Sequence, residues 1–443
     1  MWAGRTPLLR AGGAGPAGPR HVPRAVAGVK CEYFMSARQP PSRSTRWARL
    51  AVGAATLAAA CLARADWQAV GTAGFSAGTA FYTSLAIHNG EPYVAYSDGG
   101  SASKATVMRY TGGSWQTVGS AGFSAGAISY TALAISSTGE PYVAFRDAAN
   151  GNEATVMACS GGTWQIVGAA AFSDGAVTYT CLALYNDEPY VAYSDAANGS
   201  RVTVMRYTGG AWQLVGSAGF SAGAATYLTL AINSVGEPHV AYVDAGTANR
   251  STVMKYTGGS WQNVGAAGFS PAAVTYTALT LDGNDTPYVS FQDGSHGNKA
   301  TCMKYSAGSW SYVGSFAFST GIAILTAVGC DAAGKPYVIY GDQSNGTKAT
   351  VMRYAGGTWS LVGTGGFSTG QVDVTSIRVL DGDPYVAFAD SGQAWKCVVM
   401  KYVGVQAPTL QANNVTCTSA ATNQLALSWT RGDGSRCAVF MKQ

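Results

Sequence analysis

Seven aspartates occupy the same position of a repeated sequence, and a charged side chain follows each of them six residues later. The aspartates are Asp98, Asp147, Asp195, Asp244, Asp293, Asp342 and Asp390, and the residues that follow are Lys104, Glu153, Arg201, Arg250, Lys299, Lys348 and Lys396. Carboxylates and basic groups that share a surface can bind the hydroxyl groups of a sugar. An aspartate at a strand end can instead accept backbone N–H groups in an Asx-turn and hold the loop. The sequence favours the second interpretation and leaves the first open.

Known catalytic patterns are nearly absent from the sequence. After residue 65 the chain has three histidines, His88, His239 and His296, at three different repeat positions, which is not the spacing of metal ligands. It contains no HExxH, no phosphate-binding glycine loop and no calcium loop of alternating aspartates. Arg146 and Arg378 break the repeat without a visible partner. We therefore expect no metal, no cofactor and no enzymatic activity, although carboxylates that meet in a central channel remain an alternative.

The elements that carry these residues are short strands. Tryptophans recur at intervals of 48 or 49 residues, from Trp67 to Trp359, a period typical of one propeller blade. The unit that starts at residue 130 contains four strand signals, YTALAI, PYVAF, ATVMAC and TWQIVG, separated by turns rich in Gly, Asn or Asp. Four antiparallel strands per unit, repeated radially, predict an all-β fold of the β-propeller type.

The phase of the repeat predicts a closed ring. Residues 66–71 form a lone tryptophan strand before the first complete unit, and the last unit, residues 375–402, lacks a tryptophan strand of its own. The N-terminal strand can therefore complete the last blade, which removes an exposed sheet edge. We predict seven blades of four antiparallel strands, closed by pairing of residues 66–71 with residues 396–402.

The repeat has a consensus that can be compared with known repeats. The pattern W-Q-x-V-G-x-x-G-F-S-x-G, then Y-T-x-L-A-I, P-Y-V-A-Y-x-D and A-T-V-M-[RK]-Y, resembles the propeller repeats of many secreted bacterial and algal proteins. It is similar more loosely to kelch-type and lectin propellers, and the match covers Trp67 to Tyr402. This resemblance implies the propeller fold and little about activity, because propellers serve as hydrolases, lectins and scaffolds.

One face of the predicted propeller gathers the candidate ligand-binding residues. If the first strand of each unit is innermost, the loop into strand one and the loop between strands two and three share that face. The candidates are the aspartates and basic residues named above, together with His296 and Trp395, the only ring-bearing side chains in this turn. The phenylalanines of the GFS turn could offer stacking platforms for sugars, but we expect them to fill the space between blades. The tryptophans should belong to the core.

The first 65 residues differ from the rest of the chain in charge. They carry ten Lys or Arg against one acid, a net of +9, whereas residues 66–443 carry 18 against 22, a net of −4. The globular part thus lacks the charge expected for binding nucleic acid. The apolar run at 50–63 is too short to span a bilayer and ends in Ala63-Arg64-Ala65, so we predict a secretory signal cleaved after Ala65. An organelle lumen reached through a two-part leader and a true start at Met35 are the alternatives.

Three domains follow: the leader (1–65), the propeller (66–402) and a tail (403–443). The tail resembles the first strands of a fibronectin type III-like sandwich, truncated, and we expect it to be poorly ordered. Five sequons, which a eukaryotic host could glycosylate, stand at Asn198, Asn249, Asn284, Asn345 and Asn414, the first four in predicted turns. The seven cysteines after residue 65 are an odd number, and we interpret those in the repeats as small core residues.

These features predict a secreted, monomeric recognition or adhesion module that is not an enzyme and has no membrane span after cleavage. The favoured partner is a glycan bound multivalently on one face, or else an extracellular protein. The alternatives are a glycan-active hydrolase or lyase with acids at the central channel, and a structural or protein-binding scaffold. A lectin needs exposed aromatic side chains on the rim, an enzyme needs two carboxylates roughly 5–10 Å apart in a cleft, and a scaffold needs neither.

Overall fold

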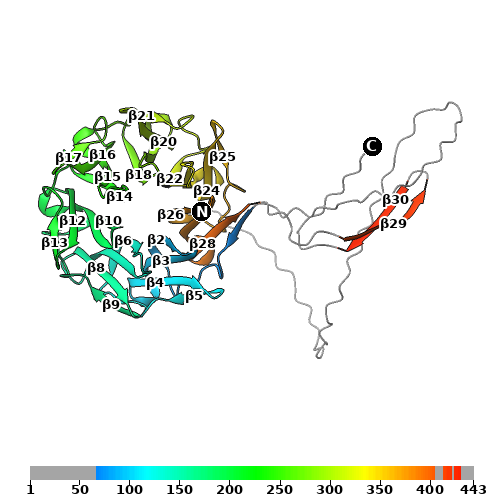
Figure 1. The fold of residues 1–443 in the computed structure, drawn as a ribbon, viewed down its shortest axis with the longest axis horizontal. Coiled ribbons are helices and arrows are strands. Elements are labelled where there is room, and N and C mark those ends of the chain that lie inside the picture. Colours follow the sequence, from blue (N-terminus) through cyan, green and yellow to red (C-terminus); the bar gives the residue numbers. More distant parts are fainter. Residues whose placement is uncertain (1–65, 405–412, 422–423, 431–443) are drawn as a thin grey trace, which may run out of the picture. The chain divides into compact units, whose positions relative to one another are not determined.

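A computed structural model describes residues 66–404, 413–421 and 424–430 of the 443-residue chain. Residues 66–404 form seven four-stranded antiparallel sheets arranged as blades around a ring (Figure 1). The predicted all-β, seven-bladed propeller is therefore confirmed. The predictions of a leader and of its cleavage after Ala65 fall outside the described residues. None of the helices in the described part is long and apolar enough to cross a membrane.

The four strands of each blade follow one another from the centre of the ring outward. The first, innermost strands are β2 (Ala80–His88), β6 (Ile128–Ile135), β10 (Val177–Tyr185), β14 (Ala225–Ile232), β18 (Val274–Leu281), β22 (Ala323–Cys330) and β26 (Val372–Leu380). The second strands are β3 (Glu91–Asp98), β7 (Pro141–Asp147), β11 (Glu188–Asp195), β15 (Pro238–Asp244), β19 (Pro287–Asp293), β23 (Pro336–Asp342) and β27 (Asp383–Asp390). Blades are numbered 1 to 7 in this order.

The outer half of each blade contains two further strands. The third strands are β4 (Lys104–Thr111), β8 (Glu153–Ser160), β12 (Arg201–Thr208), β16 (Arg250–Thr257), β20 (Lys299–Ser306), β24 (Lys348–Ala355) and β28 (Lys396–Val403). The fourth, outermost strands are β5 (Ser114–Thr117), β9 (Thr163–Ile166), β13 (Ala211–Leu214), β17 (Ser260–Asn263), β21 (Ser309–Tyr312), β25 (Thr358–Leu361) and, in blade 7, β1 (Asp66–Ala69).

Short 3-10 helices connect the second and third strands in six blades. They are η1 (Gly99–Ser101), η2 (Ala196–Asn198), η3 (Ala245–Thr247), η4 (Gly294–His296), η5 (Gln343–Asn345) and η6 (Ser391–Gln393). Outside the ring, β29 (Asn413–Ala421) and β30 (Gln424–Thr430) pair as a separate two-stranded antiparallel sheet. Its assignment to a fibronectin type III-like domain stays a prediction.

The ring is closed by the N-terminal strand, as predicted. Trp67 of β1 pairs with Tyr402 of β28, and the pairing continues through Ala69 and Met400. Figure 1 shows the blue start of the described chain beside the orange β28. Because β1 covers β28, the third strand of blade 7 has no exposed edge.

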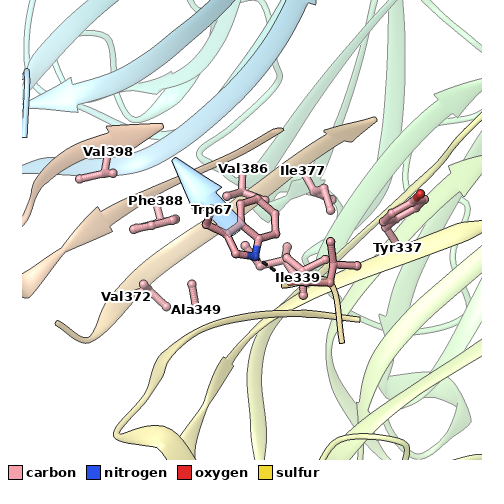
Figure 2. Packing of buried hydrophobic residues seen from close by; sticks show 11 residues of the cluster. Trp67, Tyr337, Ile339, Ala349, Val372, Ile377, Val386, Phe388 and Val398 are labelled. Atoms are coloured by element: carbon pink, nitrogen blue, oxygen red, sulfur yellow. Dashed lines mark hydrogen bonds between the residues drawn. The ribbon is translucent and has the colours of Figure 1, made fainter. Parts of the chain in front are cut away.

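Each blade packs its face against the next blade, and a tryptophan marks every interface. Trp67 donates from Nε1 to the carbonyl oxygen of Val362 in blade 6 at 2.8 Å and stacks on Phe367 with ring centroids 4.2 Å apart. Figure 2 shows Trp67 surrounded by residues of blades 6 and 7, among them Ile339 and Val386. All seven interfaces repeat this arrangement, with N–O distances of 2.7–2.9 Å and centroid distances of 3.8–4.2 Å.

The phenylalanines of the GFS turns therefore fill the space between blades, as expected from the sequence. They are Phe75, Phe123, Phe172, Phe220, Phe269, Phe318 and Phe367. Trp67 is buried, and the six other tryptophans of the repeat are partly buried. The five cysteines in residues 66–404 are unpaired, and Cys159, Cys302 and Cys397 among them are buried in the core.

The glycine that follows the valine in WQxVG is required by the blade interface. Gly71 has a φ of +70°, and an added Cβ would lie 2.6 Å from the ring of Tyr110 in the next blade. A larger residue would therefore be strained in its backbone and would push the neighbouring blade away.

Removal of residues 66–71 should sharply lower the melting temperature. The deletion exposes the edge of β28 and removes the Trp67 side chain, whose truncation alone should cost about 3–5 kcal/mol. Thermal unfolding followed by circular dichroism measures the effect, and Gln68→Ala, which changes an exposed residue of the same strand, serves as the control. An unchanged melting temperature in the deletion would show that the ring does not depend on this strand.

The stability of blade 4 should depend on pH through His239. This side chain is 4% exposed at the position where the other second strands have tyrosine, and its burial lowers the pKa below the usual 6.5. The unfolded chain then binds the proton more readily, so stability is lost as the pH falls from about 6.5 toward the lowered value. His239→Tyr should reduce the loss of unfolding free energy between about pH 7 and about pH 5. A difference between variant and wild type that stays constant over this range in urea titrations would contradict the prediction.

Candidate functional site: the loop face

The loop into the first strand and the loop between the second and third strands meet on one face of the ring. In blade 1, Gly78 N donates to Asp98 Oδ1 at 3.3 Å, and Gly99 N donates to the carbonyl of Thr79 at 2.8 Å. Ala80 N also donates to the carbonyl of Trp395 in blade 7 at 2.8 Å. The predicted shared face is thus present, and we call it the loop face.

The seven aspartates of the loop face are buried beneath it. Each of the seven aspartates is at most 2% exposed. Asp195 is typical, since it accepts from Ala197 N at 3.0 Å, from Asn198 Nδ2 at 2.7 Å and from Thr203 Oγ1 at 3.2 Å. These carboxylates cap the short helices and attach the loop to the third strand. The aspartates therefore hold the loops, as expected from the sequence. Their part in ligand binding stays a prediction and would have to be indirect, because the carboxylates are buried.

The charged residues that follow the aspartates lie opposite them in the strand register, as Asp195 does with Arg201. In the described propeller none of them forms an ion pair with its aspartate. Arg201 and Arg250 are exposed, whereas Lys104, Lys299, Lys348 and Lys396 are partly buried. These side chains can still reach a ligand on the loop face, but the structure does not bring them to one point.

Aromatic side chains from two neighbouring loops and a strand end form a cluster at blade 5. His296 of η4 lies next to Phe316, which belongs to the loop leading from blade 5 to blade 6, with ring centroids 4.2 Å apart. Tyr312, the last residue of β21, lies 5.5 Å from Phe316 between ring centroids. Phe316 is 49% exposed and Tyr312 is 37% exposed. We call these three residues the aromatic cluster.

The imidazole of the aromatic cluster is held in place by the buried carboxylate of Asp293 and by the hydroxyl of Ser295. His296 Nδ1 lies 2.8 Å from Asp293 Oδ2 and 2.9 Å from Ser295 Oγ, and Ser295 N donates to Asp293 Oδ1 at 3.0 Å. A carboxylate partner places the proton on Nδ1 and leaves Nε2 free to bond with another group. The site thus combines two exposed aromatic side chains with one oriented polar nitrogen.

The sequence indicated only part of this cluster. His296 was a candidate, whereas Phe316 and Tyr312 were missed. Their signal was a departure from the repeat, because Phe316 replaces an Ala or Gly found in the other six units. The second ring-bearing candidate, Trp395, is partly exposed with a φ of +60°, and the structure records no ring stacked on it within the described residues. The four sequons in predicted turns do lie in the connections between strands, two of them in the short helices η2 and η5, whereas Asn414 lies in β29.

The described residues contain no group of three or more His, Cys, Asp or Glu side chains arranged to hold a metal ion. The chain matches no family model and no curated protein. It is similar in fold to a six-bladed fucose-binding lectin from Aleuria aurantia, with 17% identity, a TM-score of 0.45, and coverage of 68% of this chain and 100% of the lectin.

Two enzyme structures show comparable similarity. For the α-L-arabinanase of Penicillium chrysogenum the identity is 12%, the TM-score 0.41, and the coverage 62% of this chain and 92% of the enzyme. For the sialidase of Trypanosoma rangeli the identity is 12%, the TM-score 0.43, and the coverage 74% and 55%. At these values the similarities carry no argument about what this chain binds.

The structural role of the aspartates can be tested in blade 3. Asp195→Ala leaves three donors without their acceptor and should lower the free energy of unfolding by about 1–3 kcal/mol or more. Asp195→Asn retains one acceptor oxygen and should cost less. Arg201→Ala, the exposed residue opposite, should change stability by no more than about 0.5 kcal/mol. Urea unfolding of the three variants gives the comparison, and equal stability of Asp195→Ala and wild type would contradict the capping role.

Proposed function

We propose that this protein is a secreted, non-catalytic recognition module that binds a glycan on the loop face, with the aromatic cluster as its principal contact. The observation that carries the proposal is the pair of exposed rings, Phe316 and Tyr312, beside the oriented imidazole of His296. Aromatic rings cover the C–H faces of a sugar, and a nearby polar group binds its hydroxyls. Secretion is supported by the apolar run at residues 50–63 and the small residues before Asp66.

The seven loops differ in their side chains, and these differences favour blade 5 as the principal site of the expected multivalent binding. The aspartates are engaged by the protein in every blade, so the loops differ mainly in their other side chains. In blade 5 three repeat positions that have no aromatic side chain in the other blades hold Tyr312, Phe316 and His296. The neighbouring Lys299 and other basic residues of the loop face can supply weaker contacts to further parts of a branched glycan.

A glycan array probed with the full secreted protein tests the proposal. Wild type should bind a restricted set of glycans, and Phe316→Ala should weaken that binding about tenfold, equivalent to roughly 1.4 kcal/mol. Leu214→Ala is the matched control, because Leu214 occupies in blade 3 the repeat position of Tyr312 and is 48% exposed. It should leave binding unchanged.

Two results would count against this function. No binding to any glycan would favour a protein-binding scaffold, for which Leu214 and the similarly exposed Ile166 and Leu361 offer apolar contacts. Shortened glycans recovered from the array after incubation would favour the hydrolase or lyase. Mass spectrometry of the released sugars separates this second result from simple binding.

A further inference from the structure

Five tyrosines form an arc around the axis of the ring, at a place unrelated to the aromatic cluster. They occupy the same position of the innermost strand in blades 1 to 5 and are Tyr82, Tyr130, Tyr179, Tyr227 and Tyr276. Consecutive ring centroids are 5.1–5.3 Å apart, with interplanar angles of 45–58°. Neighbouring blades of a seven-bladed propeller are related by a rotation of about one-seventh of a turn. The interplanar angles match this rotation, as expected when each ring plane runs along the axis of the ring. We call these residues the tyrosine arc.

A bulge in each innermost strand directs these side chains. The pairing of the first and second strands shifts at this position in every blade, and all seven residues there have a positive φ, between 42° and 56°. Bulges re-aim a side chain relative to the sheet. Leu325 and Val374 share the conformation in blades 6 and 7, so the bulge belongs to the fold. What the sequence adds is a phenol in five of the seven blades.

The phenols of the tyrosine arc are available for binding. All five side chains are partly exposed, and within residues 66–404 none of their hydroxyls has a hydrogen-bond partner in the protein. Burial raises the pKa of Tyr82 and Tyr227, and it raises that of Tyr179 to about 12. Each phenol hydroxyl can both donate and accept a hydrogen bond.

Two charged side chains that break the repeat lie at one end of the tyrosine arc. Arg146 of β7 pairs with Ser129, the residue before Tyr130, and Asp373 of β26 comes directly before Val374, which holds the position of the arc in blade 7. The Nε of Arg146 is buried and has no partner within the described residues. A donor buried without an acceptor destabilises the protein, and a bound ligand could supply the missing acceptor. The six other units have uncharged residues at the position of Arg146.

We propose that the tyrosine arc, with Arg146 and Asp373, is a second ligand site that takes the terminal residue of an uncharged sugar chain. A guanidinium and a carboxylate together add no net charge, and they offer a donor and an acceptor to neighbouring sugar hydroxyls. Rings that run along the axis suit a chain end that enters lengthwise, with its C–H groups against the phenol rings. The site is separate from the aromatic cluster, and it does not require that cluster to bind sugar.

The test uses full-length protein whose tyrosine rings carry ¹³C at the ε positions. Methyl glycosides of glucose, galactose, mannose and fucose are titrated one at a time, and the tyrosine resonances are followed by NMR. At least one glycoside should shift resonances that are assigned to the arc by single Tyr→Phe changes. The shift should persist in Phe316→Ala, which disables the aromatic cluster.

Variants within the arc decide the outcome. Tyr179→Phe, which removes only the central hydroxyl, should raise the dissociation constant about fivefold, as should Arg146→Gln. Tyr256→Phe is the matched control, because Tyr256 lies on the third strand of blade 4 and packs on Trp261. No shift of arc resonances with any of the four glycosides, or equal affinity in wild type, Tyr179→Phe and Arg146→Gln, would overturn the proposal. Loss of the shift in Phe316→Ala would also overturn it, because one site would then explain both effects.

Discussion

The link between each tryptophan and the preceding blade is the interaction on which the rest of the molecule depends. A four-stranded blade has two apolar faces and cannot bury either one alone. The indole bonds to a valine carbonyl of the neighbouring blade and stacks on the phenylalanine that follows that valine, so one residue joins two sheets by polar and apolar contacts. The last of these links depends on Trp67, which comes from the opposite end of the propeller sequence. The tryptophan contact that packs neighbouring blades is therefore also the contact that closes the ring.

This constraint determines which residues remain free for function. The aspartates, the GFS turns and the glycines of WQxVG all hold loops or interfaces, and their recurrence in seven units follows from that duty. Recurrence inside one chain thus identifies what the fold needs. Residues that depart from the repeat on a constant backbone, such as Phe316 and Arg146, are where a binding specificity can be placed without loss of the ring.

The sequence predicted the fold well because the repeat itself shows how long each blade is and which strand completes the last blade. The tryptophan period gave the blade, and the mismatch between the first and last units gave the pairing of β1 with β28. It predicted the candidate site less well. Asp98 and its equivalents look alike as capping groups and as ligands until their burial is known. Phe316 lies 20 residues from His296 in the chain, and only the shared loop face places the two rings 4.2 Å apart.

The tyrosine arc was even harder to predict from the sequence than the aromatic cluster. Its members are 48 or 49 residues apart, and as a sequence pattern they look like one more apolar position of an inner strand. Two features of the structure bring these tyrosines together: the bulge that turns each side chain, and the arrangement of the seven inner strands around one axis. Neither feature can be recognised from the local spacing of residues. Because the bulge is present also at Leu325 and Val374, the fold does not require tyrosine there. A phenol kept in five units whose hydroxyl has no partner within residues 66–404 is then better explained by what it can bind than by what it stabilises.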